Sequence, residues 1–149
     1  MNPERIRFLR ENEELTQEQM AKILGCKRSA YSLWEIDKNT IPLHYLNKMS
    51  NAFYINIDYL AFLSDEMRVE FNKNDIDRIE LGRRIRLARL ANKFSQEKLA
   101  AKLNTAHSVI SAYESGKTAV PTLFMIEIAR ITGNTLNWFL NKEISLKDQ

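Results

Sequence analysis

The feature that most constrains this chain is a repeat within its own sequence. The stretch TQEQMAKILGCKRSAYSLWE begins at Thr16, and SQEKLAAKLNTAHSVISAYE, which begins at Ser95, repeats its pattern without a gap. Gln17 then matches Gln96, an offset of 79 residues from position 17 to position 96. A chain of 149 residues that repeats at this spacing predicts two small domains rather than one larger domain.

Composition and periodicity predict an all-α, globular protein. The chain is 44% hydrophobic and 28% charged, and it contains only 4 Gly and 3 Pro to interrupt a 3.6-residue period. No run approaches the ~20 apolar residues of a membrane span, and the N-terminus lacks the apolar core of a signal peptide. The single Cys26 cannot form an internal disulfide. We therefore expect a cytoplasmic protein with no membrane partner.

Five helices are expected in each copy. Asn2 is expected to cap the first, with Pro3 at the first helical position. Thr16 and Gln19 form a capping-box pattern at the start of the second, in which Met20, Ile23 and Leu24 are expected to be buried. The remaining helices of the first copy are expected at about 27–35, 43–53 and 57–63. The second copy repeats these steps, with its last two helices at about 123–132 and 136–140.

The domains are expected at 1–64 and 81–149, joined by a short charged linker at 65–80. Lys and Arg against Asp and Glu number 8 and 8 in the first domain, 3 and 6 in the linker, and 11 and 5 in the second domain. The corresponding net charges are 0, −3 and +6. The basic second domain favours a polyanionic partner, although a solvated basic surface has the same composition.

Two short helices joined by a tight turn inside a five-helix unit form a helix-turn-helix. Both copies resemble the Cro/lambda-repressor-like (xenobiotic-response-element) family of bacterial and phage DNA-binding domains. The matching stretches are LTQEQMAKILGCKRSAYSLWE…IP and FSQEKLAAKLNTAHSVISAYESGK…VP. The resemblance implies two tandem five-helix lambda-repressor-like domains whose third helices enter the major groove of double-stranded DNA.

On this resemblance, base readout falls to the outer faces of the two third helices. In the first copy these residues are Arg28, Ser29, Ser32 and Leu33, and in the second copy His107, Ser108, Ser111 and Ala112. Arg28 suits a bidentate contact with guanine, whereas Ala112 suits a thymine methyl group. An Arg28 or His107 that is merely solvated is the alternative.

Phosphate contacts are expected from residues at helix starts and in the loops after the third helices. They are Gln17, Lys27, Lys38, Gln96 and Lys117. Free backbone N–H groups and the positive end of the helix dipole favour a phosphate at a helix start. The alternative is an exposed glutamine that has no binding role.

Two further pairs are structural ion pairs in relatives, namely Arg10 with Glu35 and Arg89 with Glu114. The loop after the third helix differs between the copies, because Asp37 stands where the second copy has Gly116. Glycine lets the backbone approach a phosphate, whereas an aspartate repels it. DNA binding by the first domain is therefore left open.

The sequence favours a DNA-binding transcriptional regulator, most simply a repressor. The alternative is a protein-interaction module, such as an antirepressor or an antitoxin, in which one or both copies no longer bind DNA. His44 and His107 occupy unmatched positions, and no cluster has metal-ligand spacing, so we expect no enzyme, metal or cofactor. A homodimer and a regulatory protein or peptide partner remain open.

Overall fold

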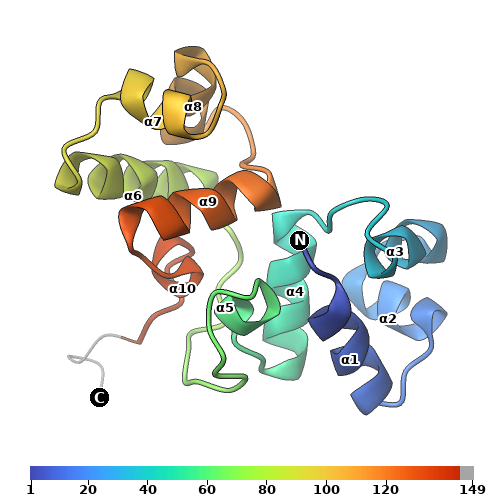
Figure 1. The fold of residues 1–149 in the computed structure, drawn as a ribbon. Helices are drawn as coiled ribbons and strands as arrows, with labels where there is room; N and C mark the ends of the chain where they lie inside the picture. Colours follow the sequence, from blue (N-terminus) through green and yellow to red (C-terminus); the bar gives the residue numbers. More distant parts are fainter. Residues whose placement is uncertain (145–149) are drawn as a thin grey trace. The chain divides into compact units, whose positions relative to one another are not determined.

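The structure, a computed structural model, describes residues 1–144 of the chain. Over these residues it is helical, and the only β pairing is an isolated antiparallel bridge between Phe71 and Glu143. The chain divides into two compact units, Met1–Val69 and Glu70–Gln149, which we call the first and the second unit. Among the described residues each unit carries five helices (Figure 1).

The helices of the first unit follow one another through short connections. They are α1 (Glu4–Asn12), α2 (Gln17–Leu24), α3 (Arg28–Glu35), α4 (Leu43–Phe53) and α5 (Ile57–Leu60). Helix α1 packs on α3 and α5, and α2 packs on α3 and α4. Helix α2 ends at Gly25, whose φ of 77° makes the tight turn into α3. Helices α2 and α3 therefore form a helix-turn-helix.

The second unit repeats this order in the same register. Its helices are α6 (Arg78–Ala91), α7 (Gln96–Lys102), α8 (His107–Glu114), α9 (Thr122–Thr132) and α10 (Leu136–Phe139). The 79-residue offset places α3, α4 and α5 residue for residue on α8, α9 and α10. The predicted all-helical fold with two tandem helix-turn-helix domains is confirmed.

The two cores use the same seven positions of the repeat, and each of these side chains is fully buried. They are Ile6, Met20, Tyr31, Leu46, Met49, Ile57 and Leu60 in the first unit, and Ile85, Leu99, Ile110, Met125, Ile128, Leu136 and Phe139 in the second. Burying a large apolar side chain contributes about 1.5–3 kcal/mol, so these positions hold the helices of each unit together.

The predicted capping box agrees with the structure, whereas two other predictions about individual residues need correction. The Thr16–Gln19 capping box is present at the start of α2. However, Ile23 is 48% exposed, because α2 turns the small Ala21 toward the core instead. Helix α1 also begins one residue later than expected, since the Asn2 side chain accepts a hydrogen bond from the Glu4 N–H at 2.9 Å and Pro3 becomes the cap residue.

The segment 65–80, expected to be a linker, is divided between the units. The N–H of Asn56 donates to the carbonyl of Met67 at 2.9 Å, which ties the beginning of the segment to the first unit. Past residue 70, Phe71 is 3% exposed, and the N–H of Asn72 donates to the carbonyl of Lys142 at 2.8 Å. Main-chain hydrogen bonds therefore connect the beginning of this segment to the first unit and residues 71–72 to the second, which charge composition alone does not indicate.

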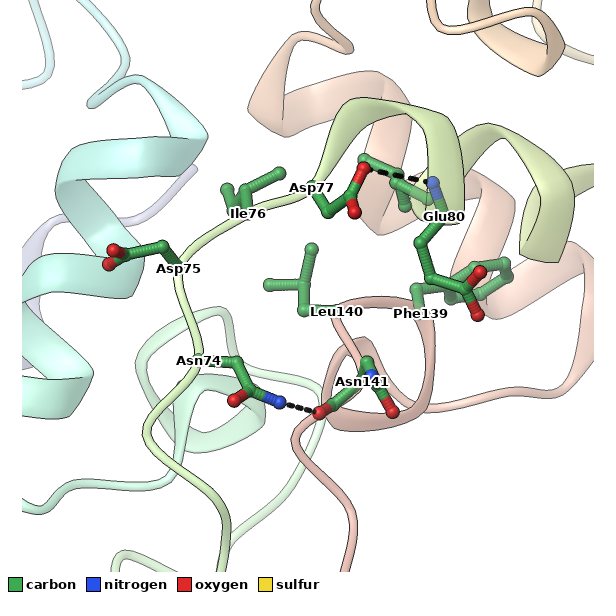
Figure 2. Close-up of a pocket in the computed structure, with 9 residues that line it drawn as sticks. Asn74, Asp75, Ile76, Asp77, Glu80, Phe139, Leu140 and Asn141 are labelled. Carbon is green, nitrogen blue, oxygen red and sulfur yellow. Dashed lines mark hydrogen bonds between the residues drawn. The ribbon is translucent and has the colours of Figure 1, made fainter.

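A pocket of about 200 Å³ lies in the second unit, between residues 74–77, the start of α6 and α10. Figure 2 shows Asp77 capping the first turn of α6 and the Asn74 side chain hydrogen-bonded to the Asn141 carbonyl. Asp75 and Glu80 also belong to its lining, but Figure 2 shows the Asp75 carboxylate pointing away from Leu140 and Asn141, and Glu80 is paired with Arg83 and Arg84.

Helix α6 lies against the main chain at the end of α8 at Gly82. A Cβ atom added there would meet the carbonyl oxygens of Tyr113 and Glu114 well inside van der Waals contact. The 79-residue offset matches this position to Pro3, which lies just before α1. The additional first turn of α6 is therefore compatible with α8 only because residue 82 has no side chain.

We expect Gly82→Ala to destabilise the protein by about 1–3 kcal/mol through overpacking. At an exposed helix position the same change would stabilise by roughly 0.5–1 kcal/mol, so the sign of the effect is diagnostic. Urea unfolding followed by circular dichroism measures it, and a variant more stable than the parent would contradict the close approach.

Candidate nucleic-acid interface

An ion pair joins the first and third helices of each unit. In the first unit Arg10 Nε donates to both carboxylate oxygens of Glu35, at 2.8 and 3.0 Å, and Arg10 Nη1 donates to the Leu15 carbonyl at 2.8 Å. Burial lowers the pKa of Arg10, but the hydrogen bond and charge of Glu35 outweigh it and the pKa is raised. Burial, and then the Glu35 carboxylate, raise the pKa of Tyr31 nearby. The environment thus favours a charged Arg10 and a neutral Tyr31.

The second unit repeats this arrangement. Arg89 forms a two-pronged pair with Glu114, with Nε to Oε2 at 2.6 Å and Nη2 to Oε1 at 3.0 Å. Its Nη1 donates to the Phe94 carbonyl at 2.8 Å. The two side chains are 9% and 5% exposed. In both units the arginine therefore joins the first helix to the end of the third helix and to the loop before the second helix.

Each buried carboxylate also binds the glutamine that begins the second helix. Gln17 Nε2 donates to Glu35 at 3.2 Å, and Gln96 Nε2 donates to Glu114 at 3.1 Å. Both glutamines are half-buried first residues of their helices, α2 and α7. Sequence reasoning missed these bonds, although the constant spacing of glutamine and glutamate in both copies was a signal for them.

The start of α3 presents a polar surface. Lys27, Arg28 and Ser29 are exposed at its cap and first turn. Ser32 is half-buried and its hydroxyl donates to the Ser29 carbonyl at 3.0 Å, so this hydroxyl is satisfied within the helix. Leu33 is 36% exposed on the next turn.

The start of α8 is smaller and carries a histidine. His107 and Ser108 are exposed, whereas Ser111 and Ala112 are half-buried. His107 Nε2 lies 3.8 Å from a carboxylate oxygen of Glu97, which is in the first turn of α7. This carboxylate beside the expected base-reading face was not anticipated from the sequence.

The loops after the third helices have the same backbone shape but different side chains. Asp37 has a φ of 58° and Gly116 a φ of 75°, so both occupy the left-handed region. The N–H of Lys38 donates to the Leu33 carbonyl, and that of Lys117 to the Ala112 carbonyl, each at 3.0 Å. Both lysines are exposed. The first unit therefore keeps the loop but places a carboxylate in it.

Two arginines of α6, Arg83 and Arg84, are engaged within the second unit. Arg83 and Arg84 each donate to Glu80, and Arg84 also bonds the Trp138 carbonyl and, at 2.9 Å, the Asn141 side chain. These hydrogen bonds, Arg83 first and then Arg84, lower the pKa of Glu80 from 4.5 to about 2. Arg84 therefore connects α6 to α10.

Residues 1–144 contain no group of three or more His, Cys, Asp or Glu side chains placed to hold a metal ion. Over the same residues no helix is long and apolar enough to cross a membrane.

Comparison with known proteins agrees with this geometry. The family described as "Helix-turn-helix domain" matches residues 4–66, and the family described as "Helix-turn-helix" matches residues 85–139. The uncharacterized HTH-type transcriptional regulator YobD of Bacillus subtilis (strain 168) is 32% identical over 63 residues. That match covers 42% of this chain and 56% of YobD, so the chain spans little more than half of that relative's length.

Two five-helix units with a helix-turn-helix at the same place define a class of tandem helix-turn-helix proteins. The two helix-turn-helix family matches fall one on each unit, in agreement with the expected resemblance of both copies to Cro/lambda-repressor-like helix-turn-helix domains.

We expect Glu114→Ala to cost about 1–3 kcal/mol of folding free energy, because it leaves the buried Arg89 guanidinium without its carboxylate. Glu127→Ala is the control, since Glu127 pairs with Arg130 at 2.7 Å on the surface and such pairs contribute ~0.5 kcal/mol. Thermal unfolding compares the two variants. Equal melting temperatures would mean that burial adds nothing to the Arg89–Glu114 pair.

Acid should weaken the second unit through Glu80. Its folded-state pKa of about 2 lies below the ordinary 4.5, so the stability it contributes is complete above about pH 4.5 and is lost as the pH falls toward 2. Because this side chain is 28% exposed, solvent limits the effect to about 1 kcal/mol. Urea unfolding of the parent and of Glu80→Gln should therefore differ near pH 6 and converge near pH 2. A difference that is constant with pH would contradict the assignment.

Proposed function

We propose that this chain is a sequence-specific double-stranded-DNA-binding transcription regulator that acts as a repressor. The observation that carries the proposal is the duplicated arrangement of a glutamine at the start of the second helix beside an exposed start of the third helix. A helix start with free N–H groups suits a phosphate, and the neighbouring helix start suits the edges of bases. The description of YobD as a transcriptional regulator supports the same function.

In this function α3 and α8 enter the major groove. Arg28, exposed at the first position of α3, is suited to donate two hydrogen bonds to a guanine. The small α8 face admits close approach, and His107 offers one donor or acceptor. Binding that covers a promoter would block transcription without any catalysed reaction. We assign the protein to the cytoplasm of a bacterium or a phage-infected cell.

The units are proposed to contribute unequally. Residues 1–69 carry 9 Lys and Arg against 10 Asp and Glu, whereas residues 70–149 carry 13 against 9. The second unit also keeps Gly116 in the phosphate loop, where the first unit has Asp37. We therefore assign most of the affinity to the second unit. The first unit adds selectivity because tethering raises its effective concentration at the DNA.

A second candidate applies to the first unit alone. Ile36 is 61% exposed and Leu33 is 36% exposed, and both lie beside Asp37 at the end of α3. Exposed apolar side chains next to a carboxylate are better suited to bind another protein than to contact the phosphate backbone of DNA. In this candidate the first unit binds a regulatory protein or peptide, or a second copy of the chain, while the second unit binds DNA.

Selection of bound duplexes from a random-sequence library, followed by gel shifts at a stated salt concentration, tests the proposal. Enrichment of one sequence that then competes against bulk DNA supports specific recognition. Binding without enrichment would leave only a phosphate-binding protein, and no binding at low salt would overturn the function.

Paired variants of the full chain test the unequal contributions. We expect Gln96→Ala with Lys117→Ala to weaken binding about tenfold or more and to reduce the slope of log K against log salt by about one, because one cationic phosphate contact is lost. The matched pair Gln17→Ala with Lys38→Ala should weaken binding less. Fluorescence anisotropy with a labelled duplex measures both. Equal losses from the two pairs would make the first unit a full DNA-binding domain.

A further inference from the structure

We propose that Glu35 and Glu114 are positioning residues for the DNA backbone. Each carboxylate holds the side-chain amide of the first residue of the neighbouring helix, Gln17 or Gln96, so that its second N–H is presented to a phosphate. This inference rests on the proposed DNA-binding function and identifies which buried group prepares its phosphate contacts.

Each carboxylate accepts three hydrogen bonds, and at Glu35 two of them share the single Nε–H of Arg10. Glu114 receives two hydrogen bonds from Arg89, at 2.6 and 3.0 Å, and one from Gln96 at 3.1 Å. Glu35 receives two from Arg10, at 2.8 and 3.0 Å, and one from Gln17 at 3.2 Å. Donors from the first and second helices thus meet at the last residue of the third helix.

An ionised carboxylate also decides which way the amide turns. It can only accept hydrogen bonds, so it binds the NH₂ group of the glutamine and repels the carbonyl oxygen. An amide NH₂ carries two N–H donors, and the carboxylate uses one of them. The other remains for an external acceptor at the helix start, where backbone N–H groups already favour an anion.

The charge of each glutamate is kept away from the DNA. Glu35 is 3% exposed, and the Glu114 side chain is 5% exposed. Each is neutralised by its arginine, so the carboxylate can order an amide without presenting a negative charge to the phosphates. A glutamine side chain that is not held in place would lose rotamer entropy on binding DNA. The hydrogen bond to the glutamate already orders the side chain in the free protein, so less entropy is lost on binding.

The ion pair itself does not need the glutamine. The guanidinium already makes two hydrogen bonds to the carboxylate and one to the carbonyl of Leu15 or Phe94. The glutamine contact nevertheless recurs in both units, although the neighbouring start of the third helix differs, with Arg28 in one and His107 in the other. A contact that persists while its surroundings change points to a role beyond local folding.

The test is a double-mutant cycle in the full chain with Gln96→Ala, Glu114→Gln and the double variant. A random-sequence duplex of about 30 base pairs, roughly three helical turns, is the probe at low salt. In Glu114→Gln the remaining acceptor oxygen is taken by Arg89, so no anion orients Gln96. Each single variant should weaken binding roughly three- to tenfold, and the double variant should bind no more weakly than Gln96→Ala.

The sign of the Glu114→Gln effect separates positioning from electrostatics. Removing a negative charge would by itself strengthen binding to DNA. Weaker binding, measured below the melting temperature of every variant, therefore supports positioning. Arg84→Ala is the stability control, since Arg84 bonds Glu80, the Trp138 carbonyl and Asn141 but no residue of the interface. It should lower the melting temperature without weakening binding.

Several outcomes overturn the inference. Additive losses in the double variant would mean that Glu114 acts independently of Gln96, and unchanged or tighter binding by Glu114→Gln would remove its role. If Glu114→Gln does not fold, the Gln17→Ala and Glu35→Gln cycle in the first unit provides the same comparison. A parent protein that binds no duplex at low salt would instead refute the proposed function, which distinguishes the two failures.

Discussion

The buried ion pair between the first and third helices is the interaction on which the candidate interface depends. A buried pair adds little net stability, because desolvating two charges offsets most of their attraction, but losing one partner is costly. Its value here is geometric. Arg89 joins α6 to the end of α8 and to the Phe94 carbonyl just before α7, so one guanidinium sets the helix-turn-helix against its scaffold. Arg10 does the same in the first unit.

The two units keep a common scaffold and differ on their surfaces. All seven matched core positions are apolar in both units, since each must fill the space between helices. Apart from the buried Glu35 and Glu114, only the serines match on the third helices, Ser29 with Ser108 and Ser32 with Ser111, whereas Arg28 is aligned with His107. Packing constrains the inner positions and leaves the outer ones free. Such surfaces are suited to different base sequences or partners.

Much of the fold could be predicted because periodicity and capping are local properties. The Thr16–Gln19 capping box and the bounds of α4 follow from nearby residues alone. Ile23 could not be placed, because a short helix has several apolar residues and tertiary contacts decide which are buried. The Gln17–Glu35 bond was also beyond sequence reasoning, since an amide at a helix start can face solvent or a neighbour. Its recurrence in the second copy was the only sequence signal.

The segment 65–80 changes the electrostatic argument as well as the domain bounds. Assigning residues 70–80 to the second unit adds acidic residues to it, and Arg83 and Arg84 are engaged with Glu80. Net charge is therefore a poor measure of phosphate binding, which depends on cations near the backbone.

The local charges of the second helices still differ between the units. Helix α7 carries Lys98 and Lys102, whose ammonium groups lie 5.4 and 5.1 Å from the Phe94 ring. At the matching positions α2 carries the uncharged Gln19 and Ile23. Helix α7 thus places two cations on the helix that begins with Gln96, which is where counterion release would act. The first unit has its own cations nearby, Lys22 in α2 and Lys27 and Arg28 at the start of α3. The proposal of stronger binding by the second unit therefore depends on the lysines of α7 together with Gly116 in place of Asp37.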